Sequence, residues 1–407
     1  MKLETMPLEF QAALPILETL EHAGFEAYFV GGSVRDTLLN QPIHDVDIAT
    51  SAYPEEVKAL FHRTVDTGIQ HGTVMILDHG QGYETTTFRT ESTYTDFRRP
   101  DSVTFVRSLA EDLQRRDFTV NALALKADGE IIDLFDGLGD LERQTIRAVG
   151  QAEARFHEDA LRMMRAVRFA AQLGFTIESA TLAAIKDNAA LLSKIAIERI
   201  NIEFTKLLQG QHAKYGLLEL LATNLNAFMP GLEATDLDLV GYADLLGHNQ
   251  PANAEQAWTL LVFELGLIPR DANKFLKAWK HSSNLINTVQ RAIALLNELR
   301  KGDVADWLLY QTGTDIDVAL TVAQYSEMRL DTTQLRARYA NLAIKNKREL
   351  ALNGADLTKE LGLQPGPLFG KILSTLERQV VQGSLPNQAE PLLTAAKAIV
   401  AKEEAHK

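Results

Sequence analysis

The stretch Gly31-Gly32-Ser33-Val34-Arg35-Asp36, followed shortly by Asp45-Val46-Asp47, decides the fold of this chain. The apolar run Ala27–Val30 precedes the two glycines and is expected to be a strand that ends in a tight turn. Val34–Leu39 then has helical spacing. Acidic and apolar residues alternate over 45–48, the period-two pattern of a half-buried strand. The pattern therefore predicts strand, glycine turn, helix and second strand in close succession.

The glycine turn has the composition of a phosphate-binding site. Without side chains, Gly31 and Gly32 let the backbone approach a phosphate closely, and the N–H groups at the start of the following helix favour an anion. Arg35 would add a guanidinium fork for the same phosphate. We therefore expect Gly32 and Arg35 to bind a nucleotide.

Three acidic residues are candidates for binding metal. Asp45 and Asp47 are two apart on the expected strand, so both carboxylates should point to one face. With oxygens from a triphosphate they would form a Mg²⁺ site; the alternative is a pair of exposed turn acids. Glu84, on a later strand, is the candidate for the third carboxylate that two-metal chemistry usually needs. The alternative for Glu84 is an exposed or salt-bridged side chain.

The chain changes character after Gly150. Before it, short β-branched or aromatic runs predict a small mixed or antiparallel sheet with few helices; they are Thr73–Leu77, Tyr83–Arg89, Val103–Val106 and Glu130–Phe135. After it, helical periodicity continues almost to Lys407. The fold class is therefore predicted to be α+β, with helical boundaries near 215 and 305.

Composition excludes several classes. The chain has 407 residues, of which 46% are hydrophobic, which argues against disorder. It has no apolar run of the ~18 residues that span a bilayer, no visible secretory signal and no cysteine, which suits a reducing cytosol. The net charge of −13 taken alone argues against a nucleic-acid partner. However, seven basic and two acidic residues lie between Arg270 and Lys301, as either a solvated helix face or a phosphate-tracking surface.

A further segment, Arg115-Arg116-Asp117-Phe118-Thr119-Val120-Asn121-Ala122, completes a resemblance. Together with the glycine turn and the aspartates, it resembles the nucleotidyltransferase superfamily that includes DNA polymerase beta. More closely, the chain resembles the class II CCA-adding tRNA nucleotidyltransferases and the related bacterial poly(A) polymerases. The resemblance implies that Arg116 reaches the nucleotide and that Asp117 accepts a hydrogen bond from a sugar hydroxyl. The alternative is a charged helix start with Asp117 near the cap.

The segment Glu158-Asp159-Ala160-Leu161-Arg162 resembles the amino-acid template that this family uses to choose the incoming base. Cytosine and adenine each present an amino donor beside a ring-nitrogen acceptor, which a carboxylate and a guanidinium can pair with. Asp159 and Arg162 are three apart and are expected to be neighbours on one helix face; the alternative is a plain salt bridge.

Two more arginines follow at the same spacing. On a straight helix Arg168 would point nearly opposite to Asp159, so the four side chains are not expected beside one base. The resemblance nevertheless assigns Arg165 and Arg168 to the nucleotide site.

Other matches are structural. Glu198–Glu203 resembles the family's neck motif, whose charges steady the template helix. Tyr94–Pro100 resembles the flexible loop that lets these enzymes switch from C to A, and enzymes that add only CC lack it. Gly354–Leu357 and Gly362–Pro367 resemble the tail that holds the tRNA elbow.

The resemblance implies a polymerase beta-like head over 1–148, a neck over 149–215, a body over 216–305 and a tail over 306–407. It implies addition and repair of the 3′-terminal CCA of tRNA from CTP and ATP, with two Mg²⁺ ions and release of pyrophosphate. It also favours a cytoplasmic homodimer that binds the acceptor end and elbow of tRNA. The alternatives are a poly(A) polymerase, an inactive helical tRNA-binding protein and a small-molecule nucleotidyltransferase.

Overall fold

A computed structural model describes residues 1–91 and 103–404 of the chain. The chain divides into two compact units, Met1–Gln250 and Pro251–Lys407. In the part that the structure describes, no helix is both long enough and apolar enough to cross a membrane.

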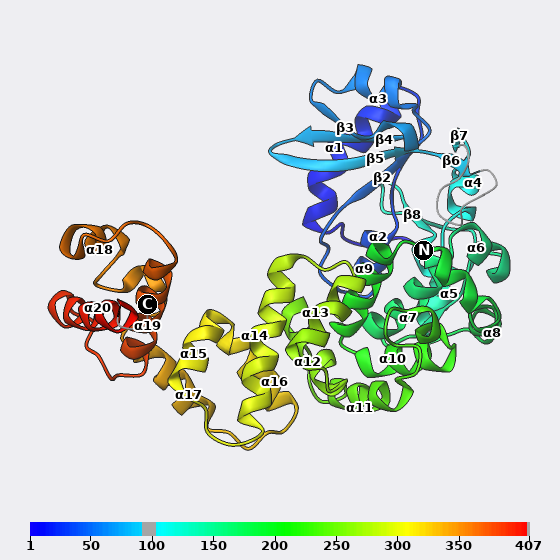
Figure 1. Cartoon of the computed structure of the whole chain (residues 1–407). Coiled ribbons are helices and arrows are strands. Elements are labelled where there is room, and N and C mark those ends of the chain that lie inside the picture. Colours follow the sequence, from blue (N-terminus) through cyan, green and yellow to red (C-terminus); the bar gives the residue numbers. More distant parts are fainter. Residues whose placement is uncertain (92–102, 405–407) are drawn as a thin grey trace. The chain divides into compact units, whose positions relative to one another are not determined.

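The first unit contains a mixed sheet, as predicted. Among the described residues, seven strands pair in the order β3-β4-β5-β2-β1-β8-β9, with β2 parallel to β5 and the other neighbours antiparallel (Figure 1). These strands are β1 (Ala27–Val30), β2 (Asp47–Thr50), β3 (Thr64–Gly68), β4 (Thr73–Asp78), β5 (Gln81–Thr87), β8 (Leu123–Leu125) and β9 (Ile131–Asp133). Two smaller pairs are β6 (Arg89–Glu91) with β7 (Val103–Phe105), and β10 (Thr145–Ile146) with β11 (Thr176–Ile177).

Strand register brings the glycine turn next to the acidic residues. Gly31 turns the chain out of β1 with a positive φ of 74°, a conformation that favours glycine. Val30, the last residue of β1, pairs with Asp47, the first residue of β2. On the other side of β2, Ile48 pairs with Thr85, which places Glu84 beside Asp47.

Helices surround this sheet and continue the unit beyond it. They are α1 (Leu8–His22), α2 (Gly32–Leu38), α3 (Pro54–Leu60), α4 (Leu109–Gln114), α5 (Gly137–Glu142), α6 (Ala152–Glu158), α7 (Leu161–Leu173), α8 (Ser179–Asn188), α9 (Ile197–Leu208), α10 (Ala213–Ala222) and α11 (Asp236–Leu246). Short 3₁₀ turns are η1 (Ile69–His71), η2 (Thr119–Asn121), η3 (Ala189–Lys194) and η4 (Leu225–Phe228).

Helix α7 is the most enclosed of the helices that concern the site. It packs against α9 and α10, and most of its residues are buried. A Cβ added to Gly216 of α10 would lie 2.5 Å from Cβ of Ala171 and 2.6 Å from the carbonyl oxygen of Val167. The two helices therefore approach so closely that only glycine fits at this position.

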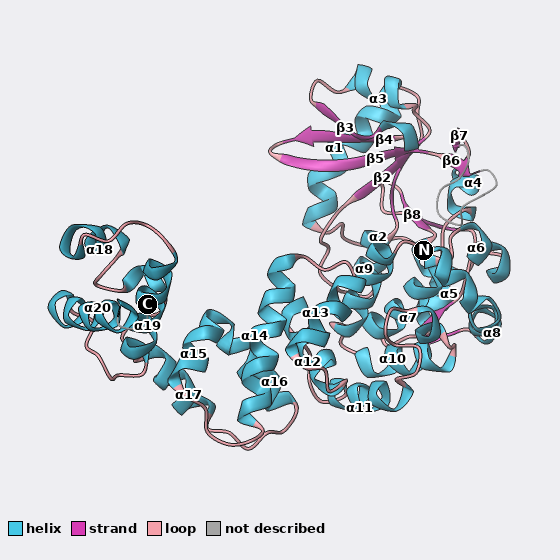
Figure 2. Cartoon of the chain, viewed as in Figure 1, coloured by secondary structure: helices cyan, strands magenta, loops and turns pink. Residues whose placement is uncertain are grey.

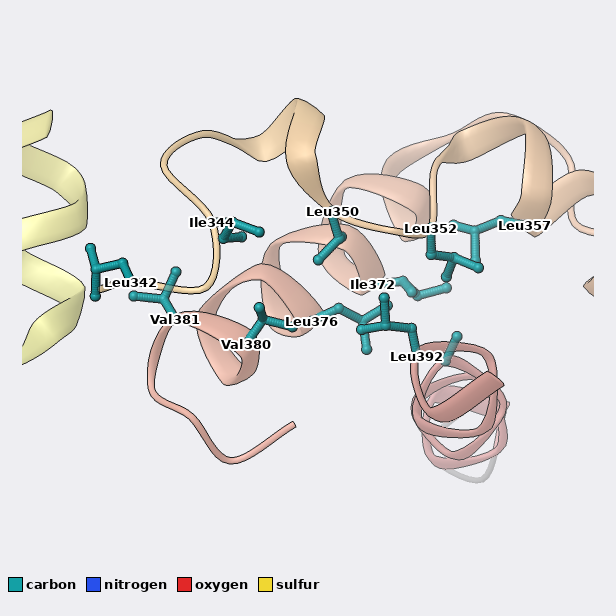
Figure 3. Close-up of a cluster of buried hydrophobic side chains, with 11 residues drawn as sticks. Leu342, Ile344, Leu350, Leu352, Leu357, Ile372, Leu376, Val380, Val381 and Leu392 are labelled. Atoms are coloured by element: carbon teal, nitrogen blue, oxygen red, sulfur yellow. The ribbon is translucent and has the colours of Figure 1, made fainter. Parts of the chain in front are cut away.

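The second unit is helical throughout its described residues, which confirms the prediction for this half (Figure 2). Its helices are α12 (Ala254–Glu264), α13 (Pro269–Ala278), α14 (Ser283–Leu299), α15 (Asp306–Thr312), α16 (Ile316–Tyr325), α17 (Thr332–Ala340), α18 (Gly354–Leu361), α19 (Pro367–Val381) and α20 (Ala389–Glu404), with 3₁₀ turns η5 (Gly313–Asp315) and η6 (Lys347–Glu349). Toward its end, α19 presents Ile372, Leu376 and Val380 to a cluster of buried aliphatic side chains that includes Leu357 and Leu392 (Figure 3).

Candidate active site

The first unit contains a cavity of about 630 Å³ between the sheet and helix α7. It is lined by Gly31, Gly32, Arg35, Asp47, His71, Arg89, Arg115, Arg116, Asp117, Asn121, Asp159, Leu161, Arg162, Arg165, Arg168, Phe169 and Arg199. Among the described residues in this lining are eight arginines and three aspartates, in a chain whose net charge is −13. Such a concentration of guanidinium groups favours a polyanionic ligand with the charge of a nucleoside triphosphate.

Most of the predicted site residues meet here. Gly32, Arg35, Asp47, Arg116, Asp117, Asp159, Arg162, Arg165 and Arg168 line the cavity. Glu84 lines an adjoining recess together with Asp47 and Arg116. Asp45 lies just outside β2 and lines neither space.

Arg35 is buried and held in place by neighbouring side chains. Its Nε and Nη2 donate to Asp36 Oδ1 at 2.8 and 2.6 Å, and its Nη1 donates to Asn121 Oδ1 at 2.6 Å. Its guanidinium lies 5.0 Å from the ring centre of Phe169. A positive group fixed in this way beside Gly32 needs little reorganisation to bind phosphate.

The acidic side of the site differs in one respect from the prediction. β2 begins at Asp47, so Asp45 precedes the strand. The expectation that both aspartates lie on one strand and point to one face is therefore wrong for Asp45. Both side chains are exposed, yet Asp45 is near enough to influence Asp47 electrostatically. Partial desolvation raises the pKa of Asp47, and the charges of Glu84 and Asp45 raise it further, while Arg116 opposes them.

This surplus of negative charge suits a hard divalent cation. Within the described residues, no group of three or more His, Asp or Glu side chains is placed to hold a metal ion by itself. Asp47 and the adjacent Glu84 therefore fit an ion that takes its remaining oxygen ligands from a bound triphosphate.

The segment predicted to bind the sugar forms a tight network. Arg116 donates to Asp112 Oδ2 at 3.2 Å and to the carbonyl oxygen of Asn121 at 3.4 Å. Asp117 Oδ2 accepts from Arg165 Nε at 2.6 Å, and Asp117 Oδ1 accepts from Asn121 Nδ2 at 3.1 Å. Burial alone would raise the pKa of Asp117, but Arg165 and Asn121 hold it well below its ordinary value. Asp117 therefore stays ionised.

The predicted helical pairing of Asp159 with Arg162 is wrong. The chain leaves α6 at Asp159, which has extended backbone angles, and α7 begins only at Leu161. The carboxylate of Asp159 instead accepts hydrogen bonds from both terminal nitrogens of Arg199, at 3.2 Å to Oδ1 and 2.6 Å to Oδ2. Arg162 donates to Glu158 Oε2 at 2.7 Å and to the carbonyl oxygen of Arg115 at 2.8 Å. The two side chains still line one cavity, each fixed by its own partner.

The break before α7 also explains why Arg168 lies in the same cavity as Asp159. The helical projection required Arg168 to point away from Asp159, but Asp159 is not on that helix. Arg168 donates from Nε to Glu203 Oε2 at 2.5 Å and lies 3.7 Å above the ring of Phe169. Burial lowers the pKa of Arg168 to about 10, so it remains protonated at neutral pH.

Several lining residues were not predicted individually. Asn121 lies in the quoted sugar motif, and Arg199 lies in the neck motif, so motif membership was their signal. Phe169, which contacts three arginines, has no signal beyond helical spacing, because an aromatic residue on a helix is usually a core residue. The predicted loop Tyr94–Pro100 lies outside the described residues.

Family models match three segments of the chain. The Poly A polymerase head domain matches residues 27–147, the probable RNA- and SrmB-binding site of polymerase A matches residues 174–235, and the putative tRNA nucleotidyltransferase domain 2 matches residues 249–396.

Three relatives that match over almost the whole chain are CCA-adding enzymes. The chain is 58% identical over 400 residues to a CCA-adding enzyme from Limosilactobacillus fermentum, covering 97% of this chain and 98% of that protein. It is 57% identical to a CCA-adding enzyme from Latilactobacillus sakei, covering 98% and 100%. The crystal structure of the Bacillus stearothermophilus CCA-adding enzyme in complex with CTP aligns with a TM-score of 0.84 at 41% identity, over 99% of this chain and 100% of that one.

The mixed sheet, the glycine turn beside paired acids and the arginine-lined cavity define a nucleotidyltransferase. Enzymes of this class use divalent metal ions. The similarity extends over the whole length, and the chain belongs to the family of CCA-adding enzymes. The predicted fold class and activity are thereby confirmed.

Proposed function

We propose that the residues around the cavity add C, C and A to the 3′ end of tRNA, using CTP and ATP and releasing pyrophosphate. The observation that supports these roles is the convergence of nine predicted residues on one cavity. The tRNA 3′-hydroxyl attacks the α-phosphate, the new P–O bond forms, and the bond to the β-phosphate breaks. Gly32 and Arg35 hold the triphosphate, Arg116 and Asp117 hold the ribose, and Asp159 and Arg162 hold the base; Arg165 and Arg168 reach phosphate or hold the neighbouring elements in place.

Asp45 and Asp47, with Glu84 beside them, are proposed to bind two Mg²⁺ ions. When bound, these ions lower the pKa of the attacking hydroxyl and stabilise charge on the transferred phosphate. Asp47, in the cavity, and Glu84, in the adjoining recess, would hold the ions, with Asp45 just outside, and the surrounding arginines would align the triphosphate for in-line attack.

The metal assignment is tested by combining Asp45→Ala with Asp47→Ala. Transfer of CMP from labelled CTP to tRNA that lacks its terminal CCA should fall by about a thousandfold, as expected when transition-state charge stabilisation is removed. Asp66→Ala, an exposed residue of β3 paired with Lys58, is the matched control and should retain activity. Wild-type transfer by the double variant would show that these residues do not bind the metal.

Asp159 and Arg162 are proposed to select the base by accepting from its amino group and donating to its ring nitrogen. Mass spectrometry of truncated tRNA, incubated with all four nucleotides and Mg²⁺, should show addition of C, C and A only. Asp159→Ala should admit other bases. A long tail of A from ATP alone would instead indicate a poly(A) polymerase.

The basic segment between Arg270 and Lys301 is proposed to contact the tRNA backbone. Among the described residues, Arg270, Lys277 and Lys280 of this segment are exposed and have no ion-pair partner, whereas Lys301 pairs with Glu298 at 2.7 Å. Replacing Lys277 and Lys280 by alanine should weaken tRNA binding. It should also reduce the slope of log affinity against log salt by ~0.7–0.9 for each phosphate that the protein no longer neutralises. An unchanged slope would contradict the assignment.

The domain limits at 148, 215 and 305 remain proposals, as does the role of the tail, from 306 onward, in holding the tRNA elbow. We also propose a homodimer that acts in the cytoplasm, where tRNA, CTP and ATP are all present. Light scattering of the purified chain tests the dimer, and a mass of one chain would exclude it.

A further inference from the structure

Asp117, the residue assigned to the sugar, has no acceptor position to spare. Its Oδ1 accepts from the backbone N–H of Phe118 at 2.8 Å and from Asn121 Nδ2 at 3.1 Å. Its Oδ2 accepts from Arg165 Nε at 2.6 Å, and Nη2 of the same guanidinium forms an ion pair with Oδ2 at 2.5 Å. A carboxylate offers about four lone-pair positions; three hydrogen bonds use three of them, and the ion-paired Arg165 Nη2 blocks the second position on Oδ2. A sugar hydroxyl can reach Asp117 only if one donor leaves.

Arg165 is the donor that can leave. The N–H of Phe118 is part of the backbone, and Asn121 is held on its other side by Arg35 at 2.6 Å. Arg165 has a second carboxylate within reach, because its Nη1 already lies 3.9 Å from Glu203 Oε1. The side chain of Arg165 is 33% exposed to solvent, so the guanidinium has room to move.

The surroundings of Arg165 support two positions for its guanidinium group. The group lies 5.3 Å from the ring centre of Phe169, whose face attracts a cation at either position. Glu203 Oε2 is engaged by Arg168 at 2.5 Å, but Oε1 faces Arg165. A short movement would therefore exchange one buried ion pair for another.

We propose that Arg165 is a specificity-determining residue for the sugar: a ribose hydroxyl takes its place on Asp117, and Arg165 moves to Glu203. This inference rests on the proposed role of Asp117 in binding the sugar. The sugar hydroxyl must compete with Arg165, so the ribose contributes less affinity than an open carboxylate would give it. Binding of a ribonucleotide therefore also moves the Arg165 side chain on α7, the helix that carries Arg162.

The test compares binding of CTP, 2′-deoxy-CTP and 3′-deoxy-CTP to the full-length protein without tRNA. The quantity measured is the ratio of the deoxynucleotide Kd to the CTP Kd. In Arg165→Met the competitor is gone, so the ratio should rise by roughly tenfold for the hydroxyl that contacts Asp117, a magnitude typical of a hydrogen bond to a charged group. Arg165→Lys keeps the charge but not the planar fork, and its ratio should rise less, by about threefold.

Arg199→Met is the matched control. It removes an arginine that lines the same cavity but binds Asp159. It should weaken CTP and both deoxynucleotides by the same factor and leave the ratio unchanged. An unchanged or smaller ratio in both Arg165 variants would overturn the inference.

A spectroscopic measurement reports the movement directly. The ¹⁵Nε signal of Arg165, assigned by its disappearance in Arg165→Met, should shift with CTP and stay in place with the deoxynucleotide that lacks the contacting hydroxyl. An Arg165→Met variant that binds all three nucleotides equally would instead show that Asp117 does not bind the sugar even without its competitor, which is a failure of the proposed function. Because no tRNA is present, neither result depends on CCA addition.

Discussion

Asp47 shows how a residue suited to binding a cation can weaken the fold that carries it. Desolvation, Glu84 and Asp45 raise its pKa above the ordinary value of 3.8, so the folded protein holds a proton there more tightly than the unfolded chain does. The stability associated with that proton is fully present below the unfolded pKa and is lost as the pH rises through the folded pKa. At neutral pH and without metal, ionised Asp47 is therefore destabilising.

We predict that Asp47→Asn raises thermal stability while it abolishes nucleotide transfer. At pH 7 without Mg²⁺, the melting temperature should rise by ~1–3 °C, a modest change because solvent reaches the side chain and screens the repulsion. The gain should shrink as the pH falls through the folded pKa and vanish well below the unfolded pKa of 3.8, where Asp47 is protonated in both states. Scanning fluorimetry across this pH range is the measurement, and Asp66→Asn should give no such gain. A lower melting temperature for Asp47→Asn would refute the argument.

At the scale of elements, the packing of α7 against α10 decides where three site arginines are held. We predict that Gly216→Ala lowers the free energy of unfolding by about 1–3 kcal/mol, because its Cβ would overlap Val167 and Ala171. The variant should also weaken CTP binding, since α7 must shift.

The matched control for Gly216 is Gly241 of α11, whose added Cβ meets nothing within 4 Å. Gly241→Ala should stabilise the protein by ~0.5–1 kcal/mol, because alanine loses less backbone entropy in a helix. Urea unfolding of both variants measures the difference. Equal effects of the two substitutions would show that the close approach of α7 and α10 is unimportant.

The same elements show what the sequence could predict. The glycine turn, the strand before it and the helical second half follow from local patterns and were predicted correctly, whereas the second strand begins two residues later than expected. The break between α6 and α7 was missed, because Glu158–Arg162 has no proline or glycine to mark a helix end. The pairing of Arg35 with Asn121, of Asp159 with Arg199 and of Arg168 with Glu203 could not be predicted, since each pair joins residues far apart in sequence.

At the scale of the whole molecule, the chain has two units, and each has its own buried core. The cavity lies entirely in the first unit, whereas the aliphatic cluster around Leu376 lies entirely in the second. A ligand that binds only a folded unit stabilises that unit, by about 2.7 kcal/mol at a hundredfold excess over Kd.

We therefore predict two unfolding transitions that respond to different changes. CTP should raise the transition temperature of the first unit only. Leu376→Ala should lower the free energy of unfolding of the second unit by about 2–5 kcal/mol, and with it that unit's transition temperature, because Leu376 is fully buried. Differential scanning calorimetry with and without CTP, on both proteins, distinguishes the transitions. The prediction fails if CTP and Leu376→Ala move the same transition.

The arginine lining of the cavity has a consequence after the new bond has formed. The departing pyrophosphate carries much of the negative charge that drew the nucleotide in, so the positive field that speeds capture also slows escape. Once it has gone, most of the guanidinium groups still have a carboxylate beside them, as Arg165 has Asp117 and Arg168 has Glu203, so the ion pairs of the protein limit the repulsion between the arginines. Each cycle therefore ends with the charge of the cavity balanced by the protein itself, ready for the next triphosphate.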